Sequence, residues 1–182
     1  MGEIRYKSIG VIHSPFKEPE GTPIQPTATE GVDGIVEVFP EYAEGLEDLE
    51  GFSHIILIYH FHLSKKPSLK VKPFMDSQIH GVFSTRAQSR PNPIGISVVR
   101  LIRVEGNMLY IRDVDIVDGT PLLDIKPYVP GFDVREVERI GWLERNVHKL
   151  PASKDDGRFI KRSMKLPVVY LMRPENGIRC VR

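Results

Sequence analysis

The chain has 182 residues, of which 41% are hydrophobic and 27% are charged, and its net charge is +1. This composition is typical of a globular protein of one domain with a short appendage. A single cysteine excludes an internal disulfide and a cysteine-cluster zinc site. No apolar run approaches the ~20 residues of a membrane-spanning helix, and the start of the chain lacks the apolar region of a signal peptide. We therefore expect a cytoplasmic protein with no metal site and no membrane segment.

The charges are unevenly distributed along the chain. Residues 1–133 contain 13 Lys and Arg against 18 Asp and Glu, a net charge of −5. Residues 134–182 contain 12 Lys and Arg against 6 Asp and Glu, a net charge of +6. A basic segment on an acidic body indicates a polyanionic partner, with chance clustering of solvated surface charges as the alternative. We predict two parts that meet at this boundary, 1–133 and 134–182.

The first part consists mostly of short runs rich in β-branched and aromatic residues, separated by turn residues. A long loop rich in Pro, Gly and Thr is expected at 15–34, a short helix or turn at 41–49, and a tight hairpin turn at Gly106-Asn107. The runs predicted to form strands are residues 6–12, 34–39, 52–62, 81–85, 94–105, 108–114 and 122–129. Short strands with turns between them predict a mainly β fold, an antiparallel barrel rather than βαβ repeats.

The second part has a different pattern. Apolar residues recur every three or four positions from Val134 to Leu150, which predicts an amphipathic helix. Trp142 on this helix is expected to pack in the core or at a dimer contact rather than to stack on a base. A closing strand is expected at 166–172. Before it lies a basic patch formed by Lys161, Arg162 and Lys165. The second part is therefore predicted to be a helical and basic appendage that packs on the barrel or extends it.

The stretch Arg90-Pro91-Asn92-Pro93-Ile94-Gly95 is expected to form a stiff polar loop. Its two prolines fix φ and bias the residues before them toward extended backbone. Gly95 permits a close approach that a side chain would block. Arg86 precedes the loop and Arg90 opens it, and their guanidinium groups either bind a ligand or form structural salt bridges with the acidic body.

A second informative segment, residues 113–128, contains four aspartates and the turn signal Asp118-Gly119-Thr120-Pro121. Asp118 either caps its own turn or contacts a ligand, and the sequence leaves both alternatives open. Asp124 and Lys126 are two residues apart, so on a strand they would share a face and form a structural pair.

Together these segments resemble the TsaA-like, TrmO-type β-barrel family. That family includes S-adenosylmethionine-dependent methyltransferases that act on threonylcarbamoyl-adenosine (t6A), the modified base beside the tRNA anticodon. The matching stretches are residues 9–15, 51–54, 81–86, 90–95, 118–121 and 124–128. The resemblance implies that a TsaA-like barrel binds S-adenosylmethionine with its loops and methylates the exocyclic N6 of t6A in a tRNA anticodon loop. It also implies a homodimer with cofactor sites near the subunit boundary.

The resemblance further implies which residues contact the cofactor. They are Gln25, Pro26, Thr27, His62, Leu63, Arg86, Ile96, Asp118, Gly119, Thr120, Pro121 and Leu122. Members of the family commonly have glycine where Thr27 stands and glutamine where Leu63 stands. Nucleic-acid contacts are expected at Arg90, Lys161, Arg162 and Lys165, with Lys65, Lys66, Lys70 and Lys72 as further basic groups.

The chemistry of the site is less defined by the sequence. A Gly-x-Gly-x-x-Gly element on a βαβ unit is missing, which argues against a Rossmann-type methyltransferase. His60 and His62 share a face of the predicted strand but have no third partner for a metal ion. Asp118 and His62 are the candidates for accepting a proton from the acceptor nitrogen. The alternatives to an enzyme are a non-catalytic module that binds S-adenosylmethionine or RNA, and a plain RNA-binding barrel without a cofactor.

Overall fold

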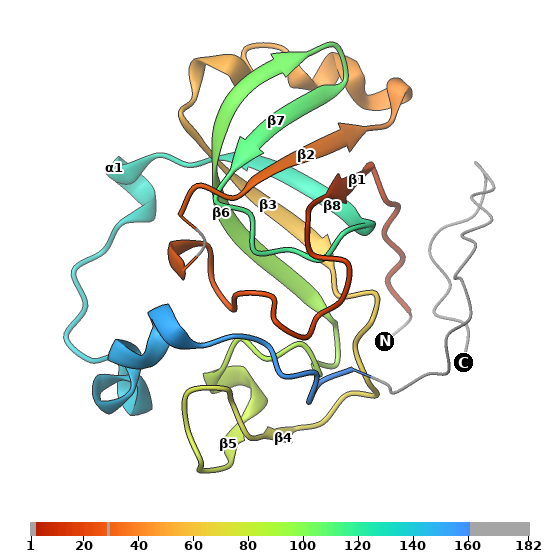
Figure 1. Cartoon of the computed structure of the whole chain (residues 1–182). Coiled ribbons are helices and arrows are strands. Elements are labelled where there is room, and N and C mark those ends of the chain that lie inside the picture. The colour runs from red at the N-terminus through yellow and green to blue at the C-terminus, as the bar shows by residue number, and fades with distance from the viewer. Residues whose placement is uncertain (1–2, 29, 161–182) are drawn as a thin grey trace.

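The computed structural model describes residues 3–28 and 30–160, and its centre is a closed barrel of six antiparallel strands. Around the barrel the strands follow the order β1-β2-β7-β6-β3-β8 (Figure 1). Their bounds are β1 Gly10–His13, β2 Asp33–Val38, β3 His54–His60, β6 Ile94–Glu105, β7 Met108–Arg112 and β8 Thr120–Pro127. The short strands β4 (Lys70–Val71) and β5 (His80–Gly81) form a separate two-stranded sheet. The predicted fold class, a mainly β antiparallel barrel, is confirmed.

Alternation of side chains along the strands builds the core. In β3, Ile55, Leu57 and Tyr59 point inward and are buried, while the residues between them are partly exposed. The facing strands contribute further apolar residues with almost no exposed surface, among them Ile12, Val36, Val99, Leu109, Ile111 and Leu122. These apolar side chains fill most of the barrel interior. A cavity opens at one end of the barrel and is described below.

The β6–β7 hairpin forms where the sequence places it. β6 has the predicted bounds, and the turn uses Gly106 at φ +60°, a left-handed conformation that glycine adopts without a steric penalty. The Asn107 side-chain amide donates to the carbonyl of Val38 at 2.6 Å, which ties the hairpin to β2. The local turn signal therefore fixes how β6 and β7 pair next to the turn.

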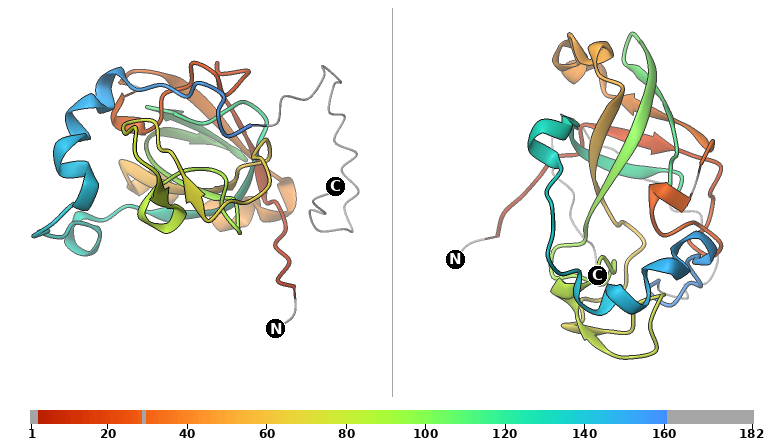
Figure 2. Two further views of the ribbon diagram at one scale, coloured as in Figure 1. Left: turned by 90° about the horizontal axis from the view of Figure 1, so that it is seen from below. Right: turned by 90° about the vertical axis from the view of Figure 1, so that its left-hand side faces the viewer.

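Short helices fill the connections. Near the β6–β7 turn lie the 3-10 helices η2 (Pro40–Leu46) and η3 (Leu49–Gly51), which match the predicted short helix or turn. The other helices are η1 Pro26–Ala28, η4 Val82–Ser84, α1 Pro130–Asp133, η5 Gly141–Arg145 and η6 Val147–Ala152. We call residues 141–160 the C-terminal strap, because they run across one end of the barrel beside the segment that carries β4 and β5 (Figure 2).

Two strand predictions were wrong near this end of the barrel. Residues 81–85 do not form a strand, because the chain turns into η4 immediately after Gly81. The hydroxyl of Ser84 donates to the Gly81 carbonyl at 2.8 Å and that of Thr85 donates to the Val82 carbonyl at 2.9 Å, which closes this turn. The strand predicted over 52–62 ends at His60, so the expected shared face of His60 and His62 on one strand does not form.

The predicted amphipathic helix from Val134 to Leu150 was also wrong. The α-helix covers only Pro130–Asp133, and the later helical turns are two separate 3-10 pieces. Gly141 has φ +62°, which interrupts a right-handed helix, and Pro151 removes a backbone donor. Val137 is 67% exposed, and the apolar residues after Gly141 face a cavity instead of a helix interface. The predicted strand at 166–172 and the basic patch lie outside the described residues.

Candidate functional site

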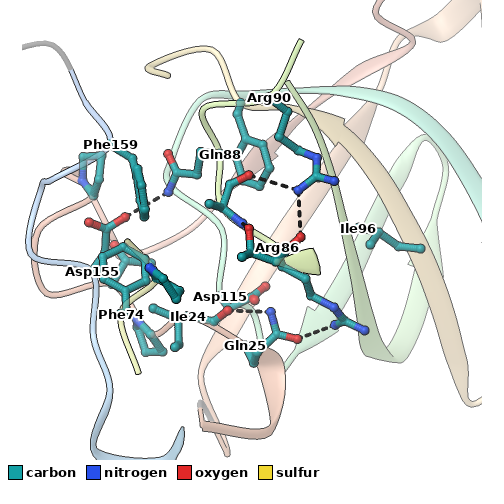
Figure 3. A pocket seen from close by; sticks show the side chains of 18 of the residues that line it. Ile24, Gln25, Phe74, Arg86, Gln88, Arg90, Ile96, Asp115, Asp155 and Phe159 are labelled. Carbon is teal, nitrogen blue, oxygen red and sulfur yellow. Dashed lines mark hydrogen bonds between the residues drawn. The ribbon is translucent and has the colours of Figure 1, made fainter. Parts of the chain in front are cut away.

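A cavity of about 660 Å³ opens at the end of the barrel that the strap crosses (Figure 3). Its walls come from the first long loop (19–25), the end of β3 and the residues after it (59–63), the segment 73–90, the start of β6 (94–96), residues 115–120 and the strap. A cavity of this size accommodates a ligand as large as a nucleoside derivative. The barrel thus supplies a rigid floor, and five loops and turns supply the walls.

Arg86 and Gln25, both predicted as cofactor contacts, meet in this cavity although they are far apart in the sequence. The Arg86 guanidinium donates from Nη1 to Oε1 of Gln25, and the Gln25 amide donates from Nε2 to the carbonyl of Ile24 at 2.6 Å (Figure 3). Gln25 therefore orients a guanidinium whose remaining donors are able to receive a carboxylate.

Beside this pair lies a carboxylate that sequence reasoning missed. Ser97 donates from Oγ to Oδ1 of Asp115 at 2.7 Å, and the Tyr59 hydroxyl lies 3.1 Å from the same Ser97 oxygen. Burial raises the pKa of Asp115 to about 7, although the Ser97 hydrogen bond and Arg86 oppose the shift. Burial, and then the neighbouring Asp115, raise the pKa of Tyr59 as well, so its phenol stays neutral.

The signal for this network is present in the sequence at Ser97. Alternation along β6 places Gly95, Ser97, Val99 and Leu101 on the inward face. A hydroxyl in that otherwise apolar row needs a buried hydrogen-bonding partner. Asp115 is the partner, and only the closed barrel brings it there.

Gly95 is required for this arrangement. The Tyr59 ring packs directly over it, and a Cβ at position 95 would overlap ring atoms. The predicted close approach at Gly95 is therefore an approach of the Tyr59 side chain. It leaves the phenol oriented toward Ser97.

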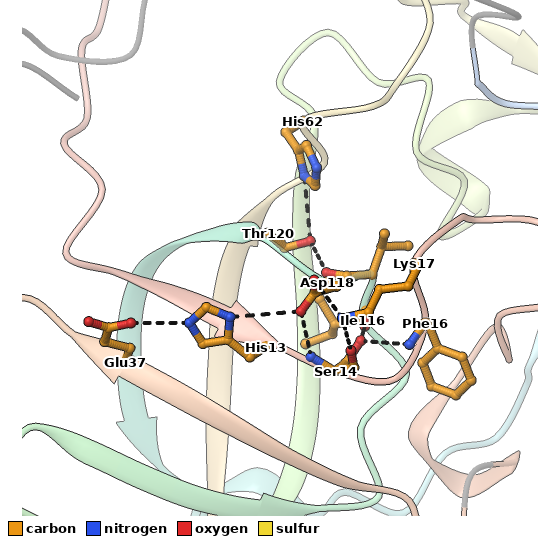
Figure 4. Close-up of polar contacts among 10 residues, drawn as sticks. His13, Ser14, Phe16, Lys17, Glu37, His62, Ile116, Asp118 and Thr120 are labelled. Atoms are coloured by element: carbon orange, nitrogen blue, oxygen red, sulfur yellow. Dashed lines mark hydrogen bonds and ion pairs between the residues drawn. The ribbon is translucent and has the colours of Figure 1, made fainter. Parts of the chain in front are cut away.

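His62 also lines the cavity, but its environment makes it a weak base. Burial, followed by the neighbouring His60, lowers the pKa of His62 to about 4, so the imidazole is neutral near pH 7. Its Nδ1 lies 3.5 Å from Oγ1 of Thr120, whose hydroxyl donates to the carbonyl of Val117 at 2.6 Å (Figure 4).

Asp118, the other candidate for proton transfer, is hydrogen-bonded to residues outside the cavity. Its carboxylate accepts from the backbone N–H of Ser14 at 3.0 Å and from Nζ of Lys17 at 2.8 Å, and His13 lies 3.7 Å away (Figure 4). Burial raises the pKa of Asp118, but Lys17, Ser14 and His13 together hold it below its usual value. Asp118 does not line the cavity, so the structure favours a structural role at the turn.

Arg90 acts as a clamp on the preceding turn. Its Nη1 donates to the carbonyls of Thr85 at 2.8 Å and Val82 at 3.1 Å, and its guanidinium lies 5.9 Å from the Phe83 ring. The contacts of Arg90 within the described residues are to backbone carbonyls and an aromatic ring rather than to an acidic side chain, and its nucleic-acid contact stays a prediction. The pair of Asp124 and Lys126 is confirmed, with 2.7 Å between Oδ2 and Nζ.

The structure brings together only part of the predicted cofactor set. The predicted residues that line the cavity are Gln25, His62, Leu63, Arg86, Ile96 and Thr120. Those outside its lining are Pro26, Thr27, Asp118, Gly119, Pro121 and Leu122. Leu122 is fully buried in the barrel core, which leaves it no side-chain surface for a ligand.

The strap forms the outer wall of the cavity and pairs with two other segments of the wall, the first long loop and the residues after β3. Residues Pro23 and Lys154 form an antiparallel bridge, and so do Ser64 and Ile160. The Phe159 ring packs edge-on against Phe74 with 5.1 Å between their centroids. In the same wall the buried Asp155 accepts from the Gln88 amide at 2.9 Å.

Trp142 belongs to this wall too. Its ring stacks on His80 with 4.7 Å between the centroids, and its Nε1 donates to the carbonyl of Ser84 at 2.8 Å. Trp142 therefore packs the strap against the segment that carries β5 and η4. It is half-buried and belongs to neither core cluster of the described residues, so the expected core position does not form, and a dimer contact stays a prediction.

Within residues 3–28 and 30–160, His, Cys, Asp and Glu form no group of three that could hold a metal ion. In the same part of the chain, the helices are too short and too polar for a bilayer crossing.

The sequence is similar to those of known proteins over most of its length. A family profile described as the tRNA-methyltransferase O N-terminal domain matches residues 11–134. A probable S-adenosyl-L-methionine-binding protein of Pyrococcus abyssi is 63% identical over 176 residues, which are 96% of each chain. A tRNA (adenine(37)-N6)-methyltransferase of Escherichia coli is 36% identical over 140 residues, which are 71% of this chain and 60% of the E. coli enzyme.

The fold is similar as well. The crystal structure of TrmO from Pseudomonas aeruginosa has a TM-score of 0.66 to this chain and is 40% identical in sequence. The alignment covers 79% of this chain and 63% of the P. aeruginosa chain, so this chain spans less than two thirds of that protein. Sequence and fold therefore agree that this chain belongs to the tRNA-methyltransferase O family.

Proposed function

We propose that this chain is an S-adenosylmethionine-dependent tRNA methyltransferase. Its substrate in this proposal is the exocyclic N6 of threonylcarbamoyl-adenosine beside the anticodon, in a cytoplasmic tRNA. The observation that carries the proposal is the cavity with Arg86, Gln25 and Asp115 at the barrel opening, in a chain of this family.

The residues of the cavity fit the parts of S-adenosylmethionine. Arg86, oriented by Gln25, offers donors for the carboxylate of the methionine end. The apolar wall between Ile24, Phe74 and the strap suits the adenine ring. The cofactor supplies a methyl group activated by a positively charged sulfur. The protein aligns the reactants and excludes water from them, which are the main contributions available to a simple displacement.

The acceptor base is presented most readily in an anticodon loop. Unpaired loop bases can be splayed out and read individually, which suits a cavity at the end of a barrel. Lys66, Lys70 and Lys72 are exposed in the segment beside the cavity, where they suit the flanking phosphates. Lys65 is engaged, because its Nζ donates to the carbonyl of Arg158 at 2.7 Å. Lys161, Arg162 and Lys165 remain predicted contacts.

We also propose a homodimer with the cavity close to the subunit boundary. Ile94 and Ile96 stand on the outward face of β6, and Phe83 precedes them beside the cavity. Phe83 is 74% exposed and Ile96 is 52% exposed. A second subunit covering these side chains would remove apolar surface from water. Light scattering on the purified protein tests this proposal, and a monomer at micromolar concentration would contradict it.

Methyl transfer to defined tRNA substrates tests the proposed reaction. The purified protein is incubated with labelled S-adenosylmethionine and with tRNA that contains or lacks t6A. We expect label only in the t6A tRNA, in a nucleoside whose mass corresponds to N6-methyl-t6A. Label in tRNA that lacks t6A would contradict the substrate proposal. Saturable cofactor binding without transfer would favour a non-catalytic binding module, and neither binding nor transfer would favour a plain RNA-binding barrel.

Arg86→Ala is the matched test of the cofactor site. We expect the affinity for S-adenosylmethionine to fall about 10- to 100-fold, because charge-assisted hydrogen bonds are lost. Arg100→Ala removes the same charge from an exposed position in the middle of β6, paired with His54 and outside the lining of the cavity, and should leave the affinity unchanged. Calorimetry measures both variants. Unchanged affinity in a folded Arg86→Ala protein would remove Arg86 from the site.

A further inference from the structure

Asp115 is an acidic side chain at the floor of the cavity, and its role follows from the groups around it. It lies close to Gln25 and Arg86, as Figure 3 shows, and Ser97 holds one of its oxygens. We propose that Asp115 accepts the proton that the acceptor nitrogen loses during methyl transfer. This inference rests on the proposed function and assigns a residue to a step for which the sequence offered only Asp118 and His62.

The hydrogen-bond chain gives Asp115 a fixed orientation. Ser97 projects from β6, and its hydroxyl both donates to Oδ1 of Asp115 and contacts the hydroxyl of Tyr59 on β3. Both partners stand on strands of the barrel, where packing restricts their rotamers. A carboxylate held in this way by a rigid scaffold is pre-oriented, as a general base needs to be.

The other acidic and basic groups near the cavity are less suited to the step. Asp118 is bound to Lys17 and Ser14 outside the cavity. Asp155 is held by Gln88 and by the backbone N–H of Gly157 within the strap. His62 is too weak a base, because burial and His60 disfavour its protonated form. Two carboxylates line the cavity among the described residues, Asp115 and Asp155. Since Asp155 is held by Gln88 and Gly157, Asp115 is the better candidate for the reaction.

The surroundings of Asp115 also set its charge. Burial disfavours its ionised form, while the Ser97 hydroxyl and the positive charge of Arg86 favour it. Tyr59, the other titratable group facing it, stays neutral. These opposing effects place the pKa of Asp115 at about 7. A general base works best when its pKa lies near the working pH, since it is then both ionised and basic enough.

The proposed step balances in atoms and charge. The acceptor nitrogen forms a bond to the methyl carbon, and the bond between that carbon and the sulfur breaks. S-adenosylhomocysteine leaves as a neutral thioether that keeps the bonding electron pair. The proton of the nitrogen passes to the Asp115 carboxylate, which becomes neutral and later releases the proton to water.

Asp115→Asn, with Asp124→Asn as the control, tests the assignment. Asp124 pairs with Lys126, and neither residue lines the cavity. Single-turnover transfer to t6A tRNA should slow on the order of 100-fold or more in Asp115→Asn, as expected for loss of a general base. Affinities for S-adenosylmethionine and S-adenosylhomocysteine should both change less than about threefold, because this carboxylate is not the cofactor anchor. The control should match the unmodified protein in rate and affinity.

The dependence on pH supplies a second signature. In the unmodified protein, kcat/KM should rise with pH through about 7 as Asp115 ionises and then level off. Asp115→Asn should lack this rise. Ser97→Ala removes a hydrogen bond that favours the ionised form, so its profile should move to higher pH.

Thermal unfolding reports on the same carboxyl without any turnover. Because the folded protein raises the pKa of Asp115 above its unfolded value of 3.8, the folded state binds the extra proton. The stabilising effect is complete below the unfolded pKa and is lost as the pH rises toward about 7. Relative to the unmodified protein, Asp115→Asn should therefore gain in melting temperature across this pH range. The same measurement shows that the variant is folded.

Four outcomes would overturn the assignment. Asp115→Asn that transfers at the unmodified rate with the same pH profile removes Asp115 from proton transfer. A large loss of affinity for S-adenosylmethionine alone would make it a partner of the sulfonium instead. A melting-temperature difference that does not depend on pH would show that the carboxyl does not titrate as proposed. Absence of transfer by the unmodified protein would overturn the proposed function, and the proton-transfer role with it.

Discussion

Gly95 is the residue that lets the floor of the cavity take its shape. The Tyr59 ring occupies the space where a side chain at position 95 would start, and the phenol then reaches Ser97. The stiff loop before Gly95 delivers the chain into β6 at this point, with the N–H of Phe61 donating to the carbonyl of Pro93 at 2.8 Å. One missing methyl group thus controls the position of a buried aromatic ring.

Gly95→Ala should displace that ring and destabilise the protein. Overpacking of this kind costs typically 1–3 kcal/mol, so we expect about this loss in the free energy of unfolding, measured by urea denaturation. Gly45→Ala is the control, because a Cβ at position 45 meets no atom within 4 Å. Equal stability of the two variants would show that Tyr59 moves aside without cost.

Individual site residues were predictable to very different degrees. The close approach at Gly95 was predictable because two prolines constrain the backbone before it and glycine lacks the side chain that would block the approach. That Arg86 and Gln25 belong to one site could be predicted only from the family resemblance, since no local sequence pattern relates residues that far apart. Asp115 was missed because its partners Ser97 and Tyr59 reach it from other strands, and only the closed barrel desolvates it.

The strap is the element whose sequence pattern was most misleading. Apolar residues at intervals of three and four appear in it, but they serve short 3-10 turns that face the cavity. Gly141, inside the predicted range, was the signal against a continuous helix. The β6–β7 hairpin was predictable by contrast, since its turn and both strands are adjacent in the sequence. Prediction from sequence therefore succeeded where the contacts are local and failed where distant segments decide the conformation.

Phe159→Ala should detach the strap from the barrel while the barrel stays folded. Phe159 is 6% exposed and belongs to a small apolar cluster with Val71, Val82, Ala87 and Phe74, separate from the barrel core. Truncation of a buried phenylalanine costs about 3–5 kcal/mol, and here the loss falls on the contact between the strap and the segment that carries β4 and β5. We expect faster amide exchange in the strap and weaker cofactor binding, with the exchange of β3 and β6 unchanged.

Phe132→Ala provides the comparison for that experiment, because Phe132 is 60% exposed and its loss opens no cavity. Hydrogen-exchange mass spectrometry resolves the two regions. If amide exchange in the strap were as slow in Phe159→Ala as in the unmodified protein, the cluster around Phe159 would not be responsible for holding the strap in place.

At the scale of the whole molecule, charge divides the chain into two parts. The acidic residues 1–133 bring no general attraction to RNA, so a phosphate backbone has to be met by local basic groups. The segment 65–72 beside the cavity supplies some of them, and the basic C-terminal residues supply the rest in the proposed function.

Replacing Lys161, Arg162 and Lys165 together by Ala should weaken tRNA binding and flatten its dependence on salt. Each lost phosphate contact reduces the magnitude of the slope of log affinity against log salt by about 0.7–0.9. The slope of the triple variant should therefore be smaller in magnitude by roughly 2 if all three contacts exist. Arg5, Lys7 and Arg100, changed together to Ala, give the same loss of charge at exposed positions of the barrel part. Filter binding over a salt series measures both, and identical slopes would exclude the C-terminal patch from the tRNA footprint.

Because the strap pairs with Pro23 and Ser64, the cavity is completed late when the protein folds during its synthesis. The six barrel strands are all present once residue 127 has emerged, and domains fold as units during synthesis. The outer wall of the cavity is then still missing, because residues 154–160 have yet to leave the exit tunnel. The nascent barrel therefore forms with an open cavity, which gains its outer wall only after residues 154–160 have emerged.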